Sequence, residues 1–207
     1  MKSKISNKAS YRERLEEIID LSYELLCRKV AEGSIEIPNE ASFQLQLGTI
    51  LKIVGQLYEF RDKDRFVINM EAHQEIEATE KSKRGIARCD IELKFLYGDT
   101  CKAKAYIELK HFRKSRTAAT TDNRFALFMD LKNLETYKSS SEICCEIVFA
   151  DDKNYTLQGK SKIDIGEGVI SPKGIVYTDE KKVTLSNSYE FHWDSFSEKH
   201  HFLKLVF

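Results

Sequence analysis

The sequence predicts a domain of the α/β class, and three of its features lead to this prediction. Between residues 87 and 110, two runs alternate apolar and polar side chains, which is the two-residue period of β-strands. The segments before and after these runs repeat apolar residues at the spacing of amphipathic helices. With 207 residues, of which 42% are hydrophobic and 32% charged, the chain is long enough to bury the core of one globular domain.

The first part of the chain is expected to hold two helices and a strand. Apolar residues at helical spacing predict a helix over 11–31, and Gly33 is placed to end it. Asn39 is placed to cap a second helix that continues to about Leu57. The segment 65–71 is the strand expected before the two alternating runs.

The second part is expected to add a helix, a buried strand and several short strands. Thr121 or Asp122 is placed to cap a third helix that ends near Lys138. The nearly continuous apolar run 142–150 is typical of a central strand that is covered on both faces. Residues 151–207 are expected to form a β-rich elaboration, because short alternating pieces lie between Gly, Asn and Asp turns. Its expected strands include residues 174–178 and 182–191.

The two alternating runs predict a β-hairpin whose register brings two carboxylates together. Gly98-Asp99-Thr100 supplies residues that favour a turn. With this three-residue connection, opposed residues have numbers that sum to 198, so Asp90 faces Glu108. Carboxylates at about 5 Å between Cβ atoms repel each other unless a cation lies between them, and Mg²⁺ suits such a site. A two-residue turn would instead place Asp90 diagonal to Glu108.

The segment from Asp90 through the hairpin to Ile107-Glu108-Leu109-Lys110 resembles the PD-(D/E)xK nuclease superfamily. Glu108-Leu109-Lys110 matches the ExK element, and Cys89 stands where the family often has proline. The resemblance covers about residues 39–150, where helix, strand, hairpin, helix and strand follow in the order of the family core. It implies a restriction endonuclease-like fold, in which helices flank a central mixed β-sheet, within a single domain over 1–207.

The resemblance also implies a role for each residue of the element. Asp90 and Glu108 would hold Mg²⁺, with the backbone carbonyl of Leu109 as a further ligand. Lys110 would position the attacking water and stabilise the charge that builds on the phosphate. An early helix in this family often adds an acidic group to the site, and Glu40 occupies that place. The alternative for Glu40 is that it complements the dipole of its helix.

Basic residues indicate a nucleic-acid partner only locally, because the formal net charge is zero. Between residues 81 and 116 there are eleven Lys and Arg residues and four Asp and Glu residues. Since Lys and Arg side chains neutralise phosphates, DNA contacts are expected at six of them: Lys81, Lys83, Arg84, Arg113, Lys114 and Arg116. For the first three, a solvated run of charge is the alternative.

These features together predict a Mg²⁺-dependent deoxyribonuclease that hydrolyses phosphodiester bonds. The short chain, which lacks a helicase or methyltransferase part, favours a type II restriction endonuclease, and such enzymes are commonly homodimers. One alternative is a catalytically inactive nucleic-acid-binding or assembly protein that keeps the fold. Another is a histidine-based site, although the five histidines show no HxxxH spacing.

Cysteine usage and hydropathy bear on location. The five cysteines form no CxxC pair, which favours a reducing, cytoplasmic environment over a disulfide framework or a zinc site. The N-terminal residues lack the apolar core of a signal peptide, and no run approaches membrane-spanning length. The sequence therefore predicts a cytoplasmic protein that has no membrane partner.

Overall fold

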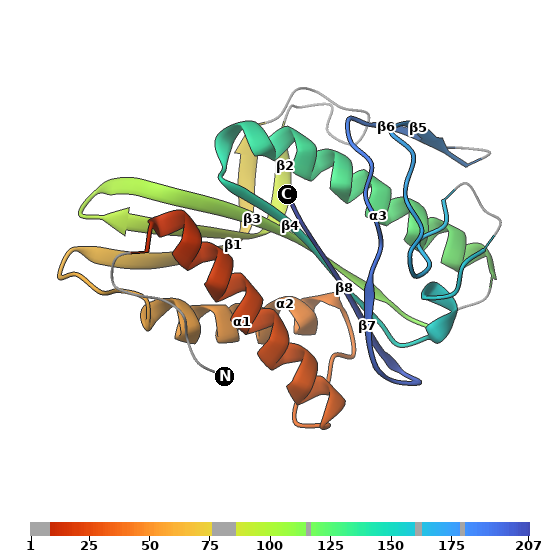
Figure 1. Ribbon diagram of the computed structural model, residues 1–207, viewed down its shortest axis with the longest axis horizontal. Helices are drawn as coiled ribbons and strands as arrows, with labels where there is room; N and C mark the ends of the chain where they lie inside the picture. The colour runs from red at the N-terminus through yellow and green to blue at the C-terminus, as the bar shows by residue number, and fades with distance from the viewer. Residues whose placement is uncertain (1–8, 76–85, 115–116, 160–162, 179–180) are drawn as a thin grey trace. The chain divides into compact units, whose positions relative to one another are not determined.

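The computed structural model of the chain describes residues 9–75, 86–114, 117–159, 163–178 and 181–207, and Figure 1 labels its main elements. The helices are α1 (Tyr11–Ala31), α2 (Glu40–Gln56) and α3 (Thr117–Tyr137). The strands are β1 (Asp64–Glu75), β2 (Ile86–Tyr97), β3 (Thr100–Phe112), β4 (Ile143–Ala150), β5 (Gly174–Tyr177), β6 (Lys182–Leu185), β7 (Trp193–Ser197) and β8 (His200–Val206). The protein is of the α/β class, as predicted.

Six of the strands form one mixed sheet in the order β1-β2-β3-β4-β8-β7, and β5 and β6 form a separate hairpin. The pairs β1–β2, β2–β3, β4–β8 and β7–β8 are antiparallel. Along β3 and β4, the Glu142 N–H donates to the Lys104 carbonyl, and the Asp151 N–H donates to the Phe112 carbonyl. From the first bond to the second, the residue numbers rise in both strands, so β4 runs parallel to β3, as expected for strands that a helix connects.

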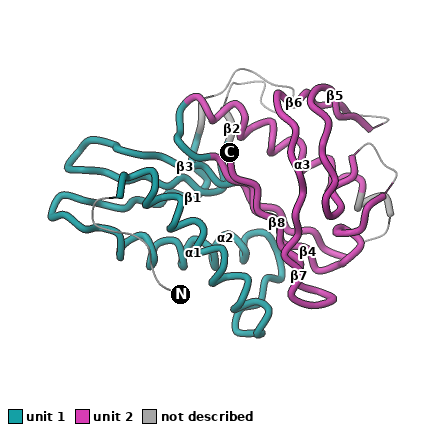
Figure 2. Tube along the Cα trace, viewed as in Figure 1, with its two compact units in different colours: residues 1–107, 140–143 teal, residues 108–139, 144–207 magenta. Residues whose placement is uncertain are grey.

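Figure 2 shows the two compact units into which the chain divides. The first unit consists of residues 1–107 and 140–143, and the second of residues 108–139 and 144–207. The boundary falls inside β3, between Ile107 and Glu108. One continuous strand supplies backbone to both units, and the single domain over 1–207 stays a prediction.

Helices α1 and α2 belong to the first unit and start at capping residues. Ser10 and Glu13 form a reciprocal capping box, in which each side chain accepts from the other's backbone N–H, at 3.2 and 2.7 Å. The Asn39 side chain accepts from the Ser42 N–H at 2.8 Å. The predicted bounds of these two helices are confirmed, including the cap at Asn39.

Close packing of α2 on β1 covers one face of the sheet in the first unit. A Cβ atom at Gly55 would lie 2.2 Å from the Phe66 ring, and one at Gly48 would lie 1.9 Å from the terminal methyl of Met70. Phe66 and Met70 lie on the same face of β1, and Met70 is opposite Ile91 of β2. The helix therefore packs on the face that carries Ile91.

The hairpin between β2 and β3 turns in two residues. Tyr97 pairs with Thr100, so Gly98 and Asp99 alone form the connection. Gly98 has φ +59°, the left-handed conformation that two-residue hairpin turns require and glycine adopts without strain. The predicted three-residue connection is wrong, because Thr100 is the first residue of β3 rather than the last of the turn.

A β-bulge restores the register that the sequence predicted. Lys102 is a surplus residue in β3, and the pairs on either side of it are Leu96 with Cys101 and Phe95 with Ala103. Beyond the bulge, opposed residues have numbers that sum to 198, as far as the pair of Ile91 with Ile107. The predicted register is therefore confirmed over this part of the hairpin, although the turn is one residue shorter.

The second unit is built around α3, β4 and β8. Every residue of β4 is buried, which confirms the prediction of a covered central strand. Val148 of β4 is opposite Leu203 of β8, and both belong to an apolar cluster with Phe128 and Leu131 of α3. Burial of this cluster is the main source of stability for the unit.

The C-terminal region is β-rich, as predicted, but differs from its prediction in three respects. The strand expected over 182–191 ends at Leu185, and the later strands β7 and β8 were not predicted. Because β8 pairs with β4, the region also completes the central sheet instead of decorating it. The core predicted over 39–150 therefore lacks two strands that the observed sheet contains.

The third helix is longer than predicted. It starts at Thr117, before the expected caps Thr121 and Asp122, and ends at Tyr137, one residue from the expected end. None of the helices in the described part of the chain combines the length and the hydropathy that a membrane span requires.

Candidate functional site

Asp90 lies on β2 in the first unit, half-buried, and its backbone is held by a side chain of α2. The Gln44 side-chain amide donates to the Asp90 carbonyl at 2.7 Å and to the Glu71 carboxylate at 3.2 Å. Glu71 has φ +51°, a conformation that non-glycine residues rarely adopt. One amide thus contacts the backbone of β2 and a side chain of the neighbouring strand β1.

Glu40 lies in the first turn of α2 and is exposed, in the place that the sequence indicated. Its helix packs on the face of β2 that carries Ile91. Side chains alternate between faces along a strand, so Asp90 belongs to the opposite face. The structure therefore places Glu40 on a helix that covers the other side of the sheet from the Asp90 side chain.

A buried charge cluster that the sequence did not predict lies on the Asp90 face of the first unit. Glu92 accepts from the Asn69 amide at 2.7 Å, forms an ion pair with Lys94 at 2.7 Å, and has Lys104 at 3.9 Å. Burial by itself would raise the pKa of Glu92, but the hydrogen bonds from Lys94 and Asn69 outweigh it and lower the pKa. A carboxylate with these partners stays ionised and binds the strands together.

The hairpin register fixes where Asp90 and Glu108 stand along their strands. In the first unit the last registered pair is Ile91 with Ile107. Asp90 directly precedes Ile91 in the chain, and Glu108 directly follows Ile107. The register sum of 198 is confirmed as far as Ile91 and Ile107, and the pairing of Asp90 with Glu108 stays a prediction.

In the second unit, Lys110 forms an ion pair with Asp130 of α3, a partner that the sequence did not predict. The Lys110 Nζ lies 2.6 Å from the Asp130 Oδ2 and donates to the Leu109 carbonyl at 3.2 Å. The side chains of Lys110 and Asp130 are 18% and 6% exposed. Glu108, two residues before Lys110 on the same face of β3, is also buried.

A further buried carboxylate, Glu146, lies on β4 in the second unit. Glu146 is 0% exposed. Sequence reasoning missed it because a single Glu inside an apolar run gave no indication of its neighbour.

Two of the six predicted phosphate-binding residues lie in the described part of the chain. Arg113 and Lys114 are exposed and follow β3 directly, and the backbone N–H of Lys114 donates to the Asp151 carboxylate. The other four, Lys81, Lys83, Arg84 and Arg116, lie outside the described residues.

The donors around Glu108 fit a hard divalent cation in kind. Carboxylate and carbonyl oxygens, here from Glu108 and Leu109, are the ligands that Mg²⁺ prefers. Within the described ranges, however, no group of three or more His, Cys, Asp or Glu side chains is arranged to hold a metal ion.

Comparison of the chain with protein-family models, with curated proteins and with solved structures found no match. The fold and the site define an α/β protein that has a mixed six-stranded sheet, with acidic and basic side chains on β2 and β3. The function is therefore argued from these residues alone.

Proposed function

We propose that the protein is a metal-dependent deoxyribonuclease with a restriction endonuclease-like core. The observation that carries this proposal is the hairpin register that pairs Ile91 with Ile107. Asp90 and Glu108 occupy the next positions along the two strands. Two carboxylates at neighbouring positions of an antiparallel pair repel each other, and a shared cation removes that repulsion.

Each residue of the proposed site has a defined part in phosphodiester hydrolysis. Asp90, Glu108 and the Leu109 carbonyl hold Mg²⁺, which when bound would supply Lewis-acid activation of the water and of the phosphate. Lys110 places positive charge beside the phosphate, where negative charge grows as water attacks and the bond to the leaving oxygen breaks. Cleavage leaves a phosphate on one product end and a hydroxyl on the other.

The basic residues after β3 support a DNA substrate. Arg113 and Lys114 are exposed and follow Lys110 by three and four residues. A DNA backbone bound at Lys110 would therefore pass near both side chains. A type II restriction endonuclease that cuts both strands of a palindromic site would work as a homodimer, because the two-fold symmetry of the site matches two copies.

A second candidate, a nucleic-acid-binding protein without catalysis, is favoured by a different observation. The Lys110 ammonium is already paired with the Asp130 carboxylate at 2.6 Å. An ammonium that is neutralised in this way exerts less electrostatic effect on a phosphate than an unpaired one. In this second candidate, Lys110 and Asp130 form a structural ion pair, and only the basic segment with Arg113 and Lys114 binds DNA.

Cleavage assays on matched variants distinguish the two candidates. The wild type is incubated with supercoiled, linear and single-stranded DNA in Mg²⁺ or EDTA. The nuclease proposal predicts cleavage only in Mg²⁺, its loss in Asp90→Asn and Glu108→Gln, and a decrease on the order of 10²-fold in Lys110→Ala. Lys132→Ala is the control, because Lys132 pairs with another acid of α3, Glu135, and is predicted to leave cleavage unchanged.

DNA binding, measured by fluorescence anisotropy in Ca²⁺, separates loss of chemistry from loss of the substrate complex. The three site variants are expected to bind a labelled duplex within about threefold of the wild type, because phosphate contacts elsewhere supply most of the affinity. If the wild type binds DNA but cleaves none of the substrates, the non-catalytic candidate is correct. If Lys110→Ala cleaves within tenfold of the wild type, the assignment of Lys110 is wrong.

A further inference from the structure

The fully buried residues of α3 that share a face with Asp130 are apolar. Leu127, Leu131 and Leu134 are fully buried on this face, and Asp130 is only 4% exposed. A buried carboxylate destabilises a fold by several kcal/mol unless a charged or hydrogen-bonding partner compensates it. The identity of that partner therefore indicates what Asp130 does.

The partner is Lys110 of β3. Its Nζ lies 2.6 Å from the Asp130 Oδ2, and it also donates to the Leu109 carbonyl at 3.2 Å. One contact comes from the helix and the other from the strand that carries the lysine, so the ammonium is directed by two separate elements. A lysine has four rotatable side-chain bonds, and without such contacts its ammonium samples many positions.

We propose that Asp130 is a positioning residue, which holds the Lys110 ammonium in the direction that it uses at the phosphate. This inference rests on the proposed function, because only a lysine that acts on substrate needs a fixed direction. Pre-organised charge stabilises a transition state at no cost in reorganisation, whereas a mobile charge must first be ordered. Asp130 touches neither substrate nor cation and acts through Lys110.

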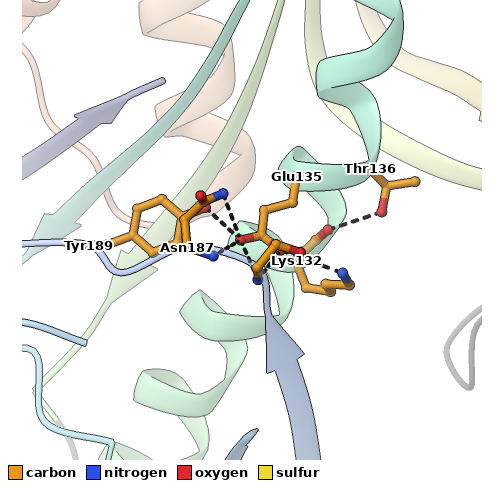
Figure 3. A network of polar contacts seen from close by, with 6 residues as sticks. Lys132, Glu135, Thr136, Asn187 and Tyr189 are labelled. Carbon is orange, nitrogen blue, oxygen red and sulfur yellow. Dashed lines mark hydrogen bonds and ion pairs between the residues drawn. The ribbon is translucent and has the colours of Figure 1, made fainter. Parts of the chain in front are cut away.

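A second pair on the same helix provides the matched control. Lys132 lies 3.5 Å from the Glu135 carboxylate, which also accepts from the backbone N–H groups of Ser186 and Asn187 (Figure 3). Glu135→Gln therefore removes a buried acid from α3 without touching Lys110. Loosening of the whole helix affects both lysines, but loss of the Asp130 contact removes a partner of Lys110 and leaves the pair of Lys132 with Glu135 in place.

The first experiment measures the freedom of Lys110 without requiring activity. Wild type, Asp130→Asn, Asp130→Glu and Glu135→Gln, each shown to be folded by circular dichroism, are treated with an amine-acylating reagent, and each lysine is quantified by peptide mass spectrometry. In Asp130→Asn, labelling of Lys110 is expected to rise about tenfold relative to Lys132, because the released side chain reaches solvent. Asp130→Glu keeps the charge and is expected to stay near the wild-type rate. Equal labelling of Lys110 in all four proteins would overturn the inference.

The second experiment measures cleavage of supercoiled DNA in Mg²⁺ by the same proteins. Asp130→Asn is expected to lower kcat on the order of 10²-fold with KM unchanged, whereas Asp130→Glu restores part of the rate and Glu135→Gln leaves it unchanged. A wild type that cleaves nothing rejects the nuclease and the positioning role together. An active wild type with unchanged kcat in Asp130→Asn rejects only the role of Asp130. If Asp130→Asn does not fold, the kcat of Asp130→Glu decides, because the longer acid displaces the ammonium, and a kcat equal to that of the wild type would reject the role of Asp130.

Discussion

Arg14 Nη1 lies 2.8 Å from Asp64 Oδ2, and both side chains are almost completely removed from solvent. The same carboxylate accepts from the Tyr11 hydroxyl at 2.7 Å and from two backbone N–H groups, those of Phe60 and Arg61. The Arg14 guanidinium also lies over the rings of Tyr11 and Phe60. This group ties α1 to the start of β1 in the first unit.

Loss of one member of this buried pair is expected to be strongly destabilising. In Asp64→Asn the guanidinium of Arg14 stays buried without its counter-charge, so the free energy of unfolding is expected to fall by about 3–5 kcal/mol. Urea denaturation followed by circular dichroism measures it. The double variant Arg14→Met with Asp64→Asn is expected to recover part of the loss, because it removes the buried charge and keeps an acceptor for the Tyr11, Phe60 and Arg61 donors. Additive losses in the double variant would contradict this account.

The close approach of α2 and β1 leads to a second prediction. Gly55→Ala places a methyl group 2.2 Å from the Phe66 ring, and a rigid ring has little room to move, so the variant is expected to lose about 1–3 kcal/mol. Gly48→Ala is the matched control, since its Cβ meets the flexible end of Met70 and the cost should be smaller. Thermal unfolding of both variants is the test, and equal losses would refute the steric explanation. In Gly55→Ala with Phe66→Leu, part of the stability should return.

The burial and hydrogen bonds of Glu135 lead to a prediction about the stability of the protein at low pH. In Figure 3 the side chain of Glu135 extends from α3 toward the segment after β6, where its carboxylate accepts from Asn187 and Tyr189. Burial by itself would raise the pKa of Glu135, but the backbone hydrogen bond from Ser186 and the bond from Tyr189 lower it below its usual 4.5. Its contribution to stability is therefore complete above pH 4.5 and is lost as the pH falls through the lowered pKa.

The measurement is urea denaturation of wild type and Glu135→Gln between pH 7 and pH 2.5. At pH 7 the variant is expected to be less stable by about 1–3 kcal/mol, the usual cost of weakening a buried, charge-assisted acceptor. Because only the wild-type residue titrates, the difference should shrink in acid. A difference that stays constant over this range would show that the charge of Glu135 does not contribute.

His192 is expected to titrate at a higher pH than an ordinary histidine. Its ring nitrogens lie 3.0 Å from Glu167 and 3.2 Å from Glu190, and the hydrogen bond to Glu167 is the main cause of the raised pKa of His192. Any stability from this group is present below pH 6.5 and is lost as the pH rises through the raised pKa. An NMR titration of the ring protons measures it. Glu167→Gln is expected to lower the pKa more than Glu190→Gln, and the reverse order would contradict the assignment.

Local signals in the sequence were sufficient for the helices of the first unit and for the hairpin strands. Ser10 and Asn39 cap their helices through contacts within three residues, and such contacts are visible in a linear sequence. The strands alternate because one face is buried, which is also a local pattern. The turn was misjudged because Thr100 suits a turn, whereas the pairing of β3 with β2 makes it a strand residue.

Long-range relationships could not be predicted from the same patterns. β8 completes the central sheet by pairing with β4, more than fifty residues earlier, and no local pattern specifies that pairing. Likewise, Asp130 meets Lys110 only through the packing of α3 on β3. A single acidic residue in an apolar helix face or strand is nevertheless a signal, because such a group needs a buried partner.

The bulge at Lys102 has a consequence for variation in this protein. The surplus residue shifts the phase of β3 by one position, so it decides which side chains of the strand share a face with Asp90. An in-frame loss of one codon near Lys102 would leave the hairpin able to close but would rotate Glu108 and Lys110 to the far side of the strand. The direction in which Glu108 and Lys110 point thus depends on a residue that lies six to eight positions away.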